Sequence, residues 1–189
     1  MPEVVDWTLL LVQLPSEPSR HRVAVWRELR RTGAVPIGAG TWLLPAAHAG
    51  LLERVRALVE RGDGSVAEIE ARPKDPGAER VLRDAYTAAR SDEWRELITD
   101  CGKFEAEIHR EIAKQKFTLG ELEEEGQSLE RLQRWLQVLQ ARDVLELDEG
   151  RVAAERVADC ERRLGEYAEL VAAAVEAAPG SADLGSGRY

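Results

Sequence analysis

Residues 8–15 read TLLLVQLP, a short and continuous apolar run that ends at a proline. A run of this length, closed by a residue that donates no backbone hydrogen bond, is typical of a buried central strand rather than a helix. The chain has 189 residues and 44% apolar content, which is enough for one compact domain with a helical extension. We therefore expect the fold to be built around this strand.

A helix is predicted over about residues 18–32, directly after the strand. Pro18 suits a first turn, and Gly33 stands where a left-handed residue commonly ends a helix. At helical spacing, the apolar residues that share one face are Val25, Trp26 and Leu29. This face predicts packing against the sheet.

The following segments predict a hairpin, a second helix and a fourth strand. Residues 35–37 and 41–45 flank a Gly-Ala-Gly turn, residues 51–59 are amphipathic, and residues 65–71 alternate between apolar and polar. The order is strand, helix, strand, strand, helix, strand. With helices on one face of an antiparallel sheet, this order predicts an α+β class with a ferredoxin-like βαββαβ module.

A linker rich in proline and charge, residues 72–77, separates this module from a helical region. One long helix is predicted over about residues 78–116, interrupted near Ser91, which suits a new N-cap. A second helix starts at the capping box formed by Thr118 and Glu121 and carries leucines near sevenfold spacing. A third follows with small and apolar residues from Ala153 to Ala174.

These helices predict a long antiparallel helical bundle, because isolated amphipathic helices depend on packing for stability. The predicted domains are 1–74 for the ferredoxin-like module, 75–178 for the bundle and 179–189 for a flexible tail. No apolar run is long enough to span a membrane, and no secretory signal is visible, so we expect a cytoplasmic protein without a membrane partner.

Charge is distributed unevenly. The first 90 residues carry 13 Lys and Arg against 12 Asp and Glu, whereas the remainder carries 13 against 23. With a net charge of −9, the protein repels nucleic acid at long range, so any nucleic-acid role requires a local basic patch.

Such a patch is predicted on the helix over residues 18–32. On a helical wheel Arg20, Arg27 and Arg31 lie within about 40° of one another, opposite the apolar face. Counting Arg22 and Arg30, residues 18–33 hold five arginines against one glutamate. Two interpretations stay open: guanidinium groups that contact successive phosphates, or the solvated face of a surface helix, which charge runs usually are.

Other candidate groups carry weaker signals. The tryptophans of the first module, Trp7, Trp26 and Trp42, predict packing in the core and in a dimer contact, with stacking on a base or a flat ligand as the alternative. Glu105 and His109 are spaced to share a cation, but such pairs also arise by composition on an acidic helix. Cys101 and Cys160 lie in apolar helical patterns, so we expect buried reduced thiols. No paired nucleophile and base appears, and we expect no enzyme, no cofactor and no metal.

Several segments carry a family resemblance. They are Trp7–Pro15, Arg22–Arg30, Gly40–Pro45, Lys116–Thr118, Gln127–Leu132 and Ala141–Val144. They look like the N-terminal region of the chromate-resistance regulator family, ChrB, over about residues 7–175. The resemblance implies a transcription factor whose DNA contacts fall on Arg20, Arg22, Arg27, Arg30 and Arg31.

A weaker likeness of two segments links the first module to the middle domain of the phenylacetate-pathway repressors, which is also ferredoxin-like and dimeric. We therefore expect a homodimer. ChrB proteins usually continue into a C-terminal domain associated with chromate sensing, which these 189 residues lack. The resemblance implies that this function is missing or is supplied by a separate polypeptide.

The sequence thus predicts a regulatory protein that binds operator DNA through its first helix. An arginine cluster binds chromate as readily as phosphate, so the same residues are candidates for a small-oxyanion site. The alternative function is a helical protein-interaction module that docks a separate sensor chain. A chromate-reducing enzyme is disfavoured, because two buried cysteines and no cofactor motif leave no route for electrons.

Overall fold

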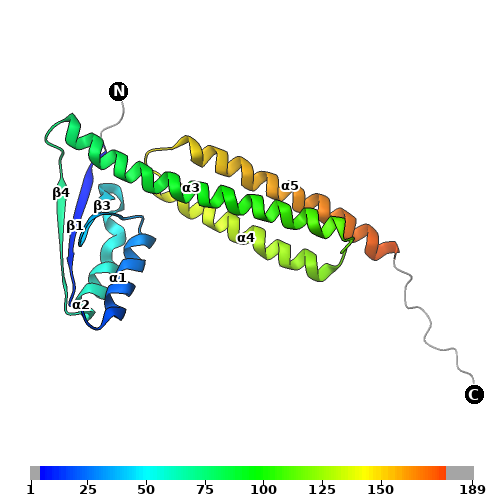
Figure 1. Ribbon diagram of the computed structural model, residues 1–189, viewed down its shortest axis with the longest axis horizontal. Coiled ribbons are helices and arrows are strands. Elements are labelled where there is room, and N and C mark those ends of the chain that lie inside the picture. Colours follow the sequence, from blue (N-terminus) through cyan, green and yellow to red (C-terminus); the bar gives the residue numbers. More distant parts are fainter. Residues whose placement is uncertain (1–4, 178–189) are drawn as a thin grey trace, which may run out of the picture. The chain divides into compact units, whose positions relative to one another are not determined.

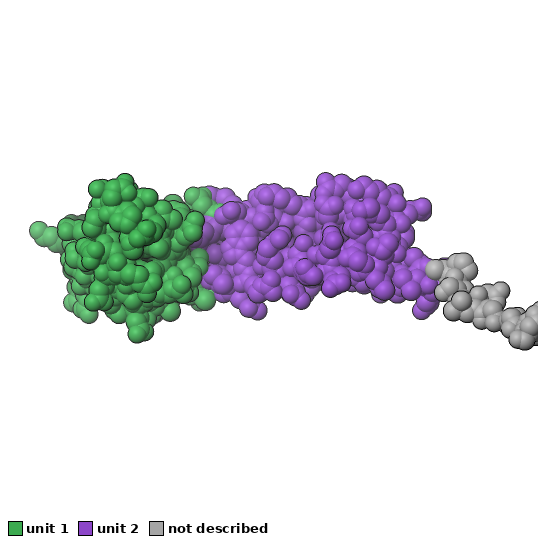
Figure 2. Space-filling model, turned by 90° about the horizontal axis from the view of Figure 1, so that it is seen from below, with its two compact units in different colours: residues 1–92, 141–147 green, residues 93–140, 148–189 purple. Residues whose placement is uncertain are grey.

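The computed structural model describes residues 5–177, and the predicted tail over 179–189 lies outside them. The chain divides into two compact units, coloured separately in Figure 2. The first contains residues up to Asp92 together with Ala141–Leu147, and the second contains Glu93–Gln140 and the residues from Asp148 onward. The division thus falls after Asp92, within a helix, whereas the sequence places a domain boundary at residue 74.

The first unit contains a four-stranded antiparallel sheet with the order β2-β3-β1-β4. Its strands are β1 (Trp7–Gln13), β2 (Val35–Gly38), β3 (Thr41–Pro45) and β4 (Ser65–Ala71). Helix α1 (Ser19–Arg31) connects β1 to β2, and a 3-10 turn, η1 (Ala46–Leu52), with helix α2 (Glu53–Arg61) connects β3 to β4. The α+β class and the element order agree with the prediction from the sequence.

Helices α1 and α2 cover one face of the sheet (Figure 1). Beneath them, the side chains of Leu10, Val25, Leu29 and Val59 are each 1% exposed or less. Removing these side chains from water stabilises the module by roughly 1.5–3 kcal/mol for each large apolar residue. This core fixes which side of α1 is buried and therefore which side faces solvent.

The opposite face of the sheet is covered at one end by the start of helix α3 (Pro76–Ala113). Trp7 of β1 packs edge-on against Tyr86 of α3, with the ring centroids 5.4 Å apart. The Tyr86 hydroxyl donates a hydrogen bond to the carbonyl oxygen of Arg142, 2.5 Å away. These contacts are the reason that residues 76–92 and 141–147 belong to the first unit.

Strand β2 forms one edge of the sheet and is short. Pro36, which has no N–H group, lies opposite Trp42, and the pairing with β3 is irregular between Pro36 and Gly38. Gly38 and Gly40 then frame the turn into β3, where Gly40 has a φ of +71°. The Gly-Ala-Gly sequence is therefore a hairpin turn, as predicted.

The second unit is a bundle of three helices. It contains α3 from Glu93 onward, α4 (Leu119–Arg142) as far as Gln140, and α5 (Asp148–Ala177). The expected interruption near Ser91 is wrong, because α3 is continuous and Ser91 is buried within it. The N-cap prediction at Thr118 is confirmed, since its hydroxyl accepts a hydrogen bond from the Glu121 N–H at 3.3 Å.

The three helices lie side by side in Figure 1, and side-chain contacts join α3 to α5. Arg156 of α5 donates to Glu105 of α3 at 2.9 Å. The Cys160 thiol lies 3.7 Å from the Cys101 carbonyl oxygen, and both cysteines are buried free thiols, as expected. Within residues 5–177, no helix combines the length and the apolar character needed to cross a membrane.

Candidate nucleic-acid interface

Helix α1 is defined at both ends by local chemistry. Pro18 precedes it in an extended conformation, with φ −79° and ψ 138°. At the other end Gly33, with a φ of +83°, donates to the Arg30 carbonyl, and Ala34 donates to the Leu29 carbonyl. This is a Schellman cap, which requires a left-handed residue at the glycine position. The helix therefore ends just after its last arginines.

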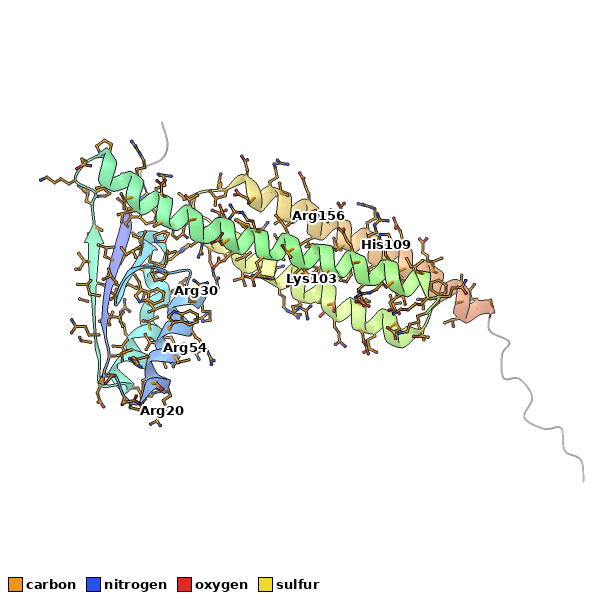
Figure 3. All side chains as sticks on the ribbon, viewed as in Figure 1. Arg20, Arg30, Arg54, Lys103, His109 and Arg156 are labelled. Carbon is orange, nitrogen blue, oxygen red and sulfur yellow. The ribbon has the colours of Figure 1, made fainter. Side chains whose placement is uncertain are left out.

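All five predicted arginines are exposed on α1: Arg20, Arg22, Arg27, Arg30 and Arg31. Arg20 lies near the beginning of the helix and Arg30 near its end (Figure 3). With a rise of 1.5 Å per residue, the row from Arg20 to Arg31 extends over about 16 Å. At 100° per residue, Arg20, Arg27 and Arg31 share one side of α1, whereas Arg22 lies about 140–180° away from them, beside the apolar face. The surroundings of the five arginines also differ.

Arg31 is held by a carboxylate. Its Nε–H and a terminal N–H both donate to Oε1 of Glu28, with the Nε contact at 3.0 Å. Arg54 of α2 reaches the other oxygen of the same carboxylate at 3.5 Å. Glu28 is buried, with 6% exposure, and two guanidinium groups neutralise its charge. The positive charge of Arg31 is therefore largely neutralised by Glu28 within the first unit.

The pKa of Glu28 is lowered from its ordinary value. The hydrogen bonds from Arg31 are the main cause, with further attraction to Arg31 and Arg54, while burial opposes the shift. A carboxylate with a lowered pKa stays charged at neutral pH. Glu28 thus keeps Arg31 paired under ordinary conditions.

The other four arginines have no such partner. In the described part of the chain, Arg20, Arg22 and Arg27 form no ion pair within 4.0 Å, and neither does Arg30. The Arg30 guanidinium instead lies 5.6 Å from the centre of the Trp26 ring. Such cation–π contacts leave the N–H groups at the edge of the guanidinium available to a further acceptor. Four positive charges on α1 are therefore available for an external anion.

The tryptophans divide between core and surface. Trp7 and Trp42 are 1% and 7% exposed, in agreement with the prediction of core packing. Trp26 is 51% exposed and so lies outside the core of this chain, which leaves a dimer contact or stacking on a flat ligand as the predictions for this residue. It follows Val25 in the sequence, and one residue corresponds to a rotation of 100° around the helix. Helical spacing relative to Val25 and Leu29 could have revealed this exposed position.

The structure does not bring the candidate cation pair of Glu105 and His109 together in a metal site. Glu105 pairs with Arg156, whereas His109 is exposed on α3 (Figure 3). No cluster of three or more His, Cys, Asp or Glu side chains suited to a metal ion occurs among residues 5–177.

Comparison with protein families adds an independent observation. A family model described as Protein ChrB, N-terminal, matches residues 22–178. The chain belongs to the ChrB N-terminal family. ChrB proteins are chromate-resistance regulators, so the family places this chain among regulatory proteins. The ChrB match begins within α1 and includes four of the five arginines, with Arg20 just before it. Comparisons with curated proteins and with solved structures gave no match.

Proposed function

We propose that this ChrB-family chain is a DNA-binding regulatory protein that contacts phosphate groups through helix α1. The observation that carries the proposal is the set of four exposed guanidinium groups that form no ion pair with a carboxylate of residues 5–177, at Arg20, Arg22, Arg27 and Arg30. Unpaired arginines on one helix suit the DNA backbone, because each can release condensed counterions on contact with a phosphate.

The rest of the chain repels polyanions, which makes the placement of these charges important. Acidic residues dominate from residue 91 onward. Binding is therefore expected only through the first unit, with α1 towards the duplex, where a helix fits the major groove of about 12 Å width. In this proposal the protein acts in the cytoplasm as a homodimer and by binding rather than catalysis.

The test is DNA binding by a charge-reversed variant. Arg20→Glu with Arg27→Glu changes two exposed residues outside the core, so the fold should be retained. We expect binding to DNA from upstream of the gene to be lost at moderate salt in a fluorescence anisotropy titration. In wild type, log affinity should fall linearly with log salt concentration, with a slope of roughly −0.9 for each neutralised phosphate.

A matched control reverses two exposed arginines elsewhere. Arg61→Glu with Arg131→Glu carries the same change in net charge but leaves α1 intact. If both double variants lose affinity equally, the effect reflects net charge alone and the α1 proposal fails.

Adding chromate to the titration tests whether the same surface holds a small oxyanion, which would compete with DNA.

A second candidate function is a protein-interaction module in the helical bundle. Val138 of α4 and Val152 and Leu170 of α5 are 37–44% exposed. A groove of about 400 Å³ lies between α4 and α5, lined in part by Leu136 and Val157. Apolar side chains in such positions suit a partner helix, such as one from a separate sensor chain. Sedimentation that shows a monomer at every concentration, with no partner captured, would contradict this function.

A further inference from the structure

An apolar pocket lies beside the basic surface of α1 in the first unit. It has a volume of about 250 Å³ and is lined by Val12, Leu14, Arg22, Val25, Trp26, Leu29, Gly40 and Trp42. This volume lies below the roughly 300–1,000 Å³ of pockets for drug-sized ligands. The pocket therefore suits a single flat ring system rather than a large molecule.

The lining has the chemistry of an aromatic-ring site. Seven of the eight lining residues are apolar or aromatic, and the eighth is an arginine. Trp42 is almost fully buried, whereas Trp26 is half exposed and presents indole surface to solvent. Gly40 contributes no side chain, and a Cβ there would lie 2.6 Å from the carbonyl oxygen of Val12.

The two charged side chains found at the pocket, Arg22 and Arg30, are both positive. Arg22 lines it, and Arg30 lies 5.6 Å from the centre of the Trp26 ring. Arg22 and Arg30 stand four residues before and after Trp26, so the three lie along one side of α1 at intervals of about 6 Å. No carboxylate lines the pocket. Its charge thus complements a ligand that is flat and apolar in one part and anionic in another.

A nucleotide has this chemistry. We propose that the pocket between α1 and the β2–β3 turn receives an unstacked nucleobase, which stacks on Trp26 while Arg22 and Arg30 hold the adjacent phosphates. Aromatic stacking with arginine nearby is a common way to bind single-stranded nucleic acid. This inference rests on the proposed function, since it assumes that α1 binds nucleic acid, and it specifies a strand with an accessible base as the preferred substrate.

The test compares three probes of equal length: a single-stranded oligonucleotide, the corresponding duplex, and an abasic single strand with the same phosphates. We expect the full chain to bind the single strand more tightly than the abasic strand. Trp26→Ala should weaken binding of the single strand roughly tenfold and leave the abasic strand unaffected. Trp26→Tyr should retain most of the affinity, because it keeps an aromatic face.

Val23→Ala is the matched control. Val23 is exposed on the same helix, at 44%, but does not line the pocket. The Val23→Ala variant should bind all three probes with the affinity of the wild-type protein. Because Trp26 is half exposed, Trp26→Ala should fold, and its thermal unfolding curve is recorded beside that of the control. A mononucleotide titration shows whether a free nucleotide or only a polymer occupies the pocket.

The two proposals fail in different ways. If Trp26→Ala binds every probe as wild type does, while the Arg20→Glu and Arg27→Glu variant loses duplex binding, the base pocket is wrong and the α1 function stands. If no probe binds even at low salt, both are wrong. If Trp26→Ala instead dissociates a homodimer without changing nucleic-acid binding, the pocket is a self-association surface and the inference is overturned.

Discussion

Arg31 donates two hydrogen bonds to Oε1 of Glu28, the residue one helical turn before it on α1. This pair separates Arg31 from the other four arginines of the helix, which form no ion pair with any carboxylate in the part of the chain that the structure describes. The carboxylate is buried and also attracts Arg54 from α2. Glu28 therefore lowers the net positive charge on the surface of α1 and stabilises the contact between α1 and α2.

Replacing Glu28 should separate these two effects. In Glu28→Gln, Arg31 and Arg54 lose their anionic partner, so nucleic-acid affinity should rise and the salt dependence should steepen by up to one unit for each arginine that reaches a phosphate. Stability should fall by about 1–3 kcal/mol, because a buried charged hydrogen bond is lost. Anisotropy at several salt concentrations and urea unfolding measure the two quantities.

Glu60→Gln is the control for Glu28→Gln, since Glu60 is exposed on α2 and forms no ion pair within residues 5–177. It makes the same change in net charge without releasing an arginine. A salt dependence that is identical in both variants would show that Arg31 gains no access to phosphate.

The hairpin turn should be sensitive to a single methyl group at Gly40. This residue has a φ of +71°, and a Cβ would lie 2.6 Å from the backbone oxygen of Val12. Gly40→Ala should lower stability by about 1–3 kcal/mol in chemical denaturation. Gly38→Ala, in the same turn, is the comparison, because its Cβ would meet no atom closer than 3.7 Å. Equal losses in the two variants would refute the steric explanation.

Glu125 in the bundle should be a destabilising residue at neutral pH. It is 8% exposed, and its pKa is raised, first by burial and then by repulsion from Glu111, Glu121 and Glu124. Because the folded state favours the protonated form, stability is highest below the pKa of the unfolded state and falls as pH rises through the folded-state pKa.

Glu125→Gln should therefore raise the melting temperature at pH 7 and change it much less near pH 4. Thermal unfolding at both pH values, with Glu123→Gln as an exposed control on the same helix that is not among the carboxylates repelling Glu125, checks this difference. A variant that melts below wild type at pH 7 would contradict it.

His48 in η1 should make the first unit sensitive to mild acid. Its pKa is lowered by burial and then by the nearby positive charges of Arg90 and Arg142, while a hydrogen bond with the backbone of Ala141 opposes the shift. A histidine with a lowered pKa in the folded state contributes stability above its unfolded pKa, about 6.5, and this contribution is lost as pH falls.

Unfolding free energy should thus decrease between pH 7 and pH 5.5, and His48→Gln should reduce that slope. His109→Gln, at an exposed position on α3, should leave it unchanged. An unaltered slope in His48→Gln would assign the acid sensitivity to other groups.

The order of the elements along the first unit and the exposure of the arginines on α1 were predictable because both depend on local patterns. The apolar run that forms β1, the Gly-Ala-Gly turn and the helical spacing of Val25 and Leu29 determine the first unit. The Glu28–Arg31 pair also follows from i, i+3 spacing on a helix and could have been identified.

Other features depend on tertiary contacts. Ser91 has the character of an N-cap, but it is buried within a continuous α3, where packing outweighs the local preference for a helix start. Arg54 comes from a different helix than Glu28, and no spacing in the sequence relates the two. The pocket beside Trp26 combines side chains of α1, β1 and β3, so only the folded chain reveals it.

Strand β2 has a consequence for assembly. Its outer edge offers few backbone groups for a further strand, since Pro36 has no amide hydrogen and the ladder is irregular before Gly38. Extension of the sheet from this side into intermolecular ribbons or amyloid-like stacks is therefore unfavourable. This edge is therefore a poor template for aggregation even though part of the sheet is left uncovered.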